Sequence, residues 1–107
     1  MATKLDRGIT FSKTGNGITS ASVTLAKTAN TEVFITDISG SSDLTGAVLT
    51  ITSGGSTIWQ DRISNNGVYQ HSFMQGLCAG VTTDVVITVT GTSNCYVNMA
   101  GVTITNQ

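Results

Sequence analysis

The chain has 107 residues, of which 39% are hydrophobic and only 10% are charged, and its formal net charge is −1. This length fits one domain with one core. Clustered Lys and Arg are missing, which argues against nucleic-acid binding, because such binding depends on cations that neutralise phosphates. With so few charges, Thr, Ser, Asn and Gln must cover much of the surface, and the low net charge favours self-association.

The start of the chain shows no targeting pattern. Residues 1–7 contain no apolar stretch of the signal-peptide kind, and the sequence has no run of 18 apolar residues. We therefore expect neither secretion by a signal peptide nor membrane insertion. Residues 1–13 are predicted to form an N-terminal arm or a first short strand, and residues 14–107 a β-sandwich domain.

Alternation of apolar and polar residues predicts strands along most of the chain. The clearest stretch is 32–63, in which Ala47, Leu49 and Ile51 fall on one face and the glycine-rich turn 53–56 returns the chain. Val85, Ile87 and Val89 form a similar apolar face. Helical periodicity and proline are both absent. The predicted strands are 8–13, 20–27, 33–38, 47–52, 57–63, 68–75, 84–90 and 95–105, which favours an all-β antiparallel sandwich, a jelly roll of about eight strands.

Glycine and asparagine predict where these strands end. Turns are expected at 14–17, 64–67 and 91–94, and 76–80 is expected to be an irregular connection between sheets. In the last strand, Val97 and Met99 are out of phase with Val102 and Ile104. A bulge at residues 100–101 would bring all four into the core.

Little in the sequence suggests catalysis. His71 is the single histidine, and no metal-binding spacing accompanies it, so we expect no metal, no cofactor and no enzymatic activity. A small hydrolase using His71 with Cys78 or Cys95 is one alternative, because such partners need only meet in space. A carboxylate pair for glycoside hydrolysis or a calcium site is another; the candidates are Asp37, Asp43, Asp61 and Asp84.

The aromatic residues admit several roles. Tyr69, His71 and Phe73 share one strand face, and Trp59 lies on a strand beside charged residues. Each fits the sandwich core, but together they are also candidates for a subunit interface, and Trp59 could serve as a platform for carbohydrate. The two cysteines are a candidate disulfide, Cys78 to Cys95, if their Cα atoms lie within about 7 Å.

Several stretches resemble the small jelly-roll proteins that decorate or cement the heads of tailed bacteriophages, which share a trimeric, tumour necrosis factor-like architecture. The stretches are 33–39, 49–55, Phe73 with Gly76 and Leu77, 85–89 and 95–101, and the likeness covers roughly residues 20–105. It implies a homotrimer that binds the major capsid protein on the outside of the virion after assembly in the host cytoplasm.

This resemblance suggests roles for particular residues. The candidate trimer interface is Trp59, Tyr69, His71 and Phe73, and the candidate capsid contacts are Lys4, Leu5 and Arg7 in the N-terminal arm. The main alternative is a carbohydrate- or receptor-binding module of a virion tail or fibre, in which Trp59 or Tyr69 would lie beside Asp61, Asn65 or Asn66. Nucleic acid and membrane are not expected as partners.

Overall fold

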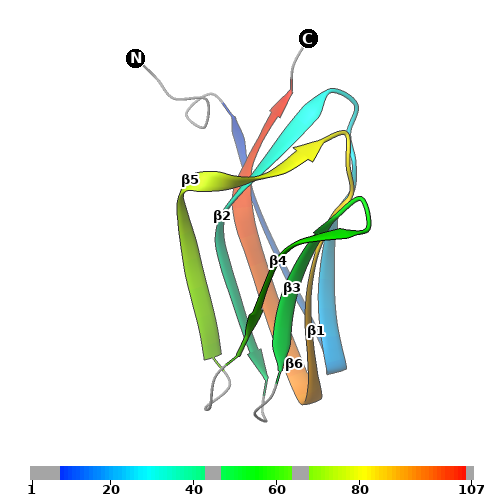
Figure 1. Cartoon of the computed structure of the whole chain (residues 1–107), viewed down its shortest axis with the longest axis vertical. Helices are drawn as coiled ribbons and strands as arrows, with labels where there is room; N and C mark the ends of the chain where they lie inside the picture. The colour runs from blue at the N-terminus through cyan, green and yellow to red at the C-terminus, as the bar shows by residue number, and fades with distance from the viewer. Residues whose placement is uncertain (1–7, 43–46, 64–67, 106–107) are drawn as a thin grey trace.

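The structure, a computed structural model, describes residues 8–42, 47–63 and 68–105 and contains only strands as regular elements in them (Figure 1). The strands are β1 (Ile9–Leu25), β2 (Thr31–Ser42), β3 (Val48–Ser53), β4 (Ser56–Arg62), β5 (Val68–Val81) and β6 (Val85–Thr105). In the described ranges no helix has the length and apolar character needed to cross a membrane.

The long strands β1 and β6 form an antiparallel ribbon that folds over on itself. They pair from Ile9 opposite Thr103 to Leu25 opposite Val85, with a register shift between Ile18 and Ser20. At roughly 3.3 Å per residue, the 21 residues of β6 would span about 69 Å if straight, whereas the longest dimension of the fold is 44 Å. Both strands must therefore bend, and each contributes one segment to either layer.

The pairings define two layers of four strand segments. One layer runs β1 (9–17), β6 (95–105), β2 and β5, and the other runs β1 (20–25), β6 (85–90), β3 and β4. All pairings are antiparallel, and β4 and β5 are the end strands of the hydrogen-bonded path. This is the predicted jelly roll with eight strand segments, in which two pairs of segments are joined as β1 and β6.

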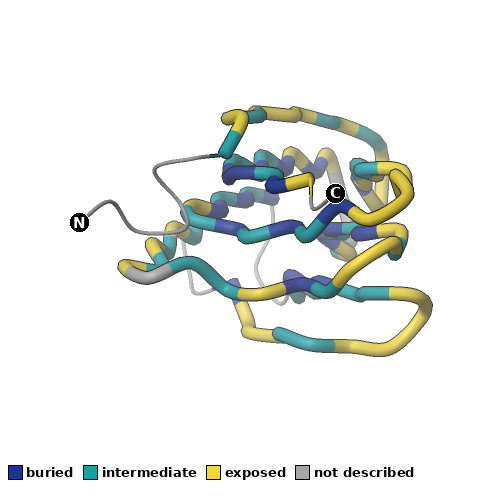
Figure 2. The backbone as a smooth tube through the Cα atoms, turned by 90° about the horizontal axis from the view of Figure 1, so that it is seen from above, coloured by how far each residue is buried: buried dark blue, intermediate teal, exposed yellow. Residues whose placement is uncertain are grey.

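Aliphatic side chains from both layers fill the space between them. Ala47, Leu49 and Ile51 are fully buried, as are Val85, Ile87 and Val89, which confirms the two apolar faces predicted from alternation. Figure 2 shows buried residues alternating with more exposed ones along the strands. The remaining members of the core come mainly from β2 and the second half of β6, including Ile35, Ile38, Val97 and Met99.

Three predicted loops, 14–17, 76–80 and 91–94, lie within strands instead, and residues 91–94 belong to β6. Residues 14–17 belong to β1, and the chain reverses two residues later, at Thr19, which has a positive φ of 66°. A Cβ on Gly17 would lie 2.1 Å from the Ser20 carbonyl oxygen, so this glycine permits the two arms of the bend to approach closely. Residues 76–80 belong to β5, which bends sharply across the molecule (Figure 1) and has a positive φ of 80° at Gly76.

The bulge expected in the last strand lies on β2 instead, and it does not bring all four side chains into the main core. The extra residue is Thr36 on β2, between the pairs Ile35–Gly101 and Asp37–Ala100, while β1 and β6 stay in register there. Val97 and Met99 face the main core. Val102 is buried too, but it lies opposite Phe34 rather than Ile35, so it faces outward, where Gly8 lies against it. Ile104 shares that face.

Candidate functional site

An aromatic cluster closes the side of the sandwich where β4 and β5 lie. The ring centroids of Trp59 and His71 are 4.9 Å apart, those of Trp59 and Phe73 are 5.0 Å apart, and those of His71 and Phe73 are 4.6 Å apart. The three side chains are half-buried. Trp59 lies opposite the buried Ile51, which places its ring on the inner side of β4. The structure thus brings together three of the four residues predicted for an interface.

Tyr69, the fourth residue, lies beside this cluster. Its hydroxyl donates a 3.1 Å hydrogen bond to the Asp61 carboxylate on β4. Burial raises the pKa of Tyr69 above its ordinary value of 10.0; the nearby Trp59 indole N–H works the other way, and Asp61 adds to the rise. The indole N–H is buried and forms no regular hydrogen bond within the described ranges. The contact between Tyr69 and Asp61 therefore tethers the two edge strands.

The two cysteines are not joined by a disulfide. Cys78 lies opposite Phe34 and Cys95 opposite Ser42, which is eight residues further along β2, or roughly 25 Å at about 3.3 Å per residue. The candidate disulfide is therefore wrong, because the two strands place the thiols at different levels of β2. The ring contacts of His71 are with Trp59 and Phe73, so the structure does not assemble the thiol–imidazole pair of the hydrolase alternative.

The Asp side chains that the structure describes accept hydrogen bonds from other groups of the same chain. Asp37 accepts a 2.7 Å hydrogen bond from the Ser72 hydroxyl, and Asp84 accepts one of the same length from the Lys27 backbone N–H. Asp61 accepts from the Arg62 backbone N–H at 2.8 Å as well as from Tyr69. Across the described residues no group of three His, Cys, Asp or Glu side chains could hold a metal ion.

Some predicted contacts fall in parts of the chain that the structure does not describe. They are Lys4, Leu5 and Arg7, proposed for the capsid, together with Asp43, Asn65 and Asn66, proposed for the alternatives. Residues 9–13, assigned to the arm or to a first short strand, are the start of β1.

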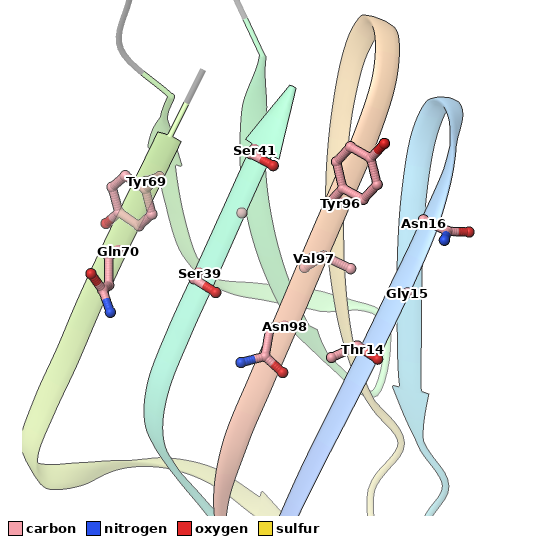
Figure 3. A pocket seen from close by; sticks show the side chains of 11 residues that line it. Thr14, Gly15, Asn16, Ser39, Ser41, Tyr69, Gln70, Tyr96, Val97 and Asn98 are labelled. Carbon is pink, nitrogen blue, oxygen red and sulfur yellow. The ribbon is translucent and has the colours of Figure 1, made fainter. Parts of the chain in front are cut away.

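A polar groove of about 690 Å³ crosses the outer face of the layer formed by β1, β6, β2 and β5 (Figure 3). Its outward side chains form two cross-strand rows. The first is Thr14, Asn98, Ser39 and Gln70; the second is Asn16, Tyr96 and Ser41. The residues between them, such as Gly40 and Val97, are buried because they face the core.

Sequence reasoning did not identify this groove, because four strands distant in sequence contribute to it. One signal was present: Asn16 and Asn98 occupy strand positions, where asparagine is disfavoured. A smaller hollow of about 160 Å³ adjoins the groove and shares Asn16 and Tyr96 with it. Tyr96, which is 48% exposed, therefore lies between two hollows.

No family model matches the sequence, and no curated protein matches it. Solved structures with a similar fold include the periplasmic lysozyme inhibitor PliG of Aeromonas hydrophila, at 9% identity and a TM-score of 0.42, covering 94% of this chain and 92% of that one. The carbohydrate-binding module CBM36, solved with calcium and xylotriose, has 12% identity, a TM-score of 0.46, and coverages of 92% and 95%.

A third similar structure is that of infectious bursal disease virus strain Gt, at 13% identity and a TM-score of 0.36, covering 94% of this chain and 34% of that one. All three likenesses concern the β-sandwich architecture alone. Identities and TM-scores this low carry no argument about function.

Proposed function

We propose that the protein is a structural virion protein, a decoration or cement protein that binds the outside of a phage head as a homotrimer and stabilises it. The observation that carries the proposal is the side of the sandwich formed by β4 and β5. These are the end strands of the hydrogen-bonded path, and the aromatic rings between them stay half-exposed in one chain. A second copy placed against this side would complete their burial.

The neighbouring surface supports the same interface. Met74 follows Phe73 in β5 and is 96% exposed. It lies in the part of β5 between Ser72 and Leu77 that has no register partner on β2. An exposed apolar side chain on an unpaired edge segment, on a chain with a net charge of only −1, favours contact between copies over repulsion. A trimer also multiplies contacts to a shell, so weak individual contacts add up to firm attachment.

The first experiment is the solution mass by sedimentation at micromolar concentration. A trimer has three times the chain mass of 11.1 kDa, about 33 kDa. Met74→Lys places a charge on the proposed interface and is expected to give monomers. Ile18→Lys, at a 76% exposed apolar position in the β1 bend, is the matched control and is expected to stay trimeric.

A wild-type monomer would overturn the trimer, and a Met74→Lys trimer would overturn the placement of the interface. Co-sedimentation with purified heads of the phage that encodes the chain then tests decoration directly. Wild type is expected to pellet with the heads and to raise the temperature at which they release DNA. A trimer that leaves this temperature unchanged and stays in the supernatant would contradict the cement role.

A further inference from the structure

We propose that the polar groove binds a neutral oligosaccharide. The first ground is its chemistry. The outward side chains contribute amides from Asn16, Gln70 and Asn98, and hydroxyls from serine and threonine. Each amide and each hydroxyl can both donate and accept hydrogen bonds. The ligand that matches such a surface carries many groups that also do both, which is the property of a sugar.

The second ground is charge. Among the described residues, no Lys, Arg, Asp, Glu or His lines the groove. A phosphate, a nucleic acid or a sulfated glycan would lose hydration there without gaining a cation, which costs free energy. The volume of about 690 Å³ lies within the roughly 300–1,000 Å³ typical of ligand pockets. The expected ligand is therefore uncharged and polyhydroxylated.

The third ground is an acceptor without a donor. The Asn98 side-chain oxygen is buried and has no hydrogen-bond partner in the part of the chain that the structure describes. An unsatisfied buried acceptor is unfavourable and rare in folded proteins. Asn98 lies in the middle of its row, between Thr14 on β1 and Ser39 on β2. Because this oxygen has almost no exposed surface, a ligand hydroxyl lying along the row can donate to it once the amide rotates toward the groove.

The fourth ground is the position of Tyr96, whose ring is the exposed aromatic surface of the groove (Figure 3). An aromatic ring covers the C–H face of a sugar ring, while its hydroxyl stays hydrated. Because Tyr96 lines both the groove and the smaller hollow beyond it, a chain of sugars can pass over it from one to the other. We therefore infer a linear oligosaccharide of several units rather than a monosaccharide.

Binding can be measured on the whole purified protein by NMR titration of ¹⁵N-labelled backbone amides. The neutral probes are cellohexaose, maltohexaose and chitohexaose, each added to about 5 mM, the range in which weak binding is detected. A heparin hexasaccharide is the charged comparison. We expect at least one neutral probe to shift amides of the groove strands, and the heparin probe to bind more weakly or not at all.

Paired variants locate the site. Tyr96→Ala is expected to weaken binding about tenfold or more, because the stacking surface is lost. Asn98→Thr replaces the amide with a strand-favouring residue and is expected to weaken binding about threefold to tenfold. Thr88→Ala is the matched control on the outer face of the other layer, where Thr88 pairs with Thr50, and is expected to leave affinity unchanged.

Absence of shifts with all three neutral probes would overturn the proposal, as would shifts outside the groove strands or tighter binding of the heparin hexasaccharide. The groove is built from one chain, so these results do not depend on the trimer. A monomer that binds an oligosaccharide would refute the oligomer proposed above and leave the groove standing. A trimer that binds no neutral sugar would do the opposite.

Discussion

The outer faces of the two layers are both polar but differ in kind. The layer containing β3 and β4 presents short hydroxyl and branched side chains, with Thr88 between Ser22 and Thr50. The layer containing β2 and β5 presents amides and an aromatic ring, with Asn98 between Thr14 and Ser39. The two faces share one strand, because Thr88 and Asn98 both belong to β6.

The difference between the two faces shows which outer residues stabilise the strands and which do not. Threonine suits a strand because its branched side chain packs on the pleated surface, whereas asparagine is disfavoured in strands. The Thr88 face is therefore accounted for by the fold alone. The Asn98 face is not, since asparagine carries a propensity cost in a strand and its side-chain oxygen is buried without a hydrogen-bond partner among the described residues. That cost supports the proposal that Asn98 binds a ligand in the groove.

We expect the largest loss of stability from a substitution on the inner face, where the two layers pack together. Ile87 is fully buried, and Ile87→Ala is expected to lower the free energy of unfolding by about 2–5 kcal/mol through lost burial and the cavity that remains. Tyr96→Ala on the outer face is expected to lower it by less than about 1 kcal/mol. Urea denaturation measures both values. Similar losses in the two variants would break the division between the inner face and the groove.

Two adjacent residues of β2 allow the same comparison between a core-facing and a groove-facing position. Gly40 faces the core, and a Cβ there would lie 2.7 Å from Val89 Cγ2 and 3.0 Å from Leu49 Cδ1. Gly40→Ala is expected to cost about 1–3 kcal/mol by overpacking. Ser39→Ala, one residue away on the groove face, is expected to change the urea midpoint little and to weaken oligosaccharide binding. A destabilised Ser39→Ala with normal binding would contradict this assignment.

The sequence predicted the faces of the strands well and the course of the chain less well. Ile51 and Ile87 were placed correctly, because burial on one side imposes strict alternation. The reversal in β1 was placed too early, at 14–17. Gly17 permits close approach beside the bend at Thr19, and composition alone does not distinguish a glycine in a turn from one beside it.

The two candidate sites could be predicted only in part for the same reason. Tyr69, His71 and Phe73 share a face because they are two residues apart, and the sequence shows this directly. Their contact with Trp59 depends on β4 and β5 meeting across the two layers, which local pattern does not encode. The polar groove requires four strands in register, so only the misfit of asparagine in a strand indicated it.

Exchanging the two central outer residues of β6 tests the comparison directly. Asn98→Thr is expected to stabilise the protein by about 0.5–1 kcal/mol, because it removes an unsatisfied oxygen and improves strand propensity, while weakening oligosaccharide binding. Thr88→Asn is expected to destabilise by a similar amount without affecting binding. Thermal unfolding monitored by circular dichroism measures both changes. If Asn98→Thr destabilises the protein, the amide stabilises the fold, and its presence is no longer evidence for a binding site.

The smallest expected effect concerns the edge joined by Tyr69 and Asp61, and it depends on pH. Burial raises the pKa of Tyr69 in the folded protein, so as the pH rises the unfolded chain loses the phenol proton first. The contribution to stability is therefore complete below about pH 10, the ordinary tyrosine pKa, and declines as the pH rises toward the raised value.

Tyr69→Phe is expected to remove this part of the decline, which appears as a smaller difference between urea midpoints at about pH 8 and about pH 11. Asp61→Asn removes the carboxylate that favours the protonated phenol and is expected to give an intermediate difference. If wild type and Tyr69→Phe lose stability equally over this range, the tether between β4 and β5 does not depend on the protonated hydroxyl, and the aromatic rings alone hold that side closed.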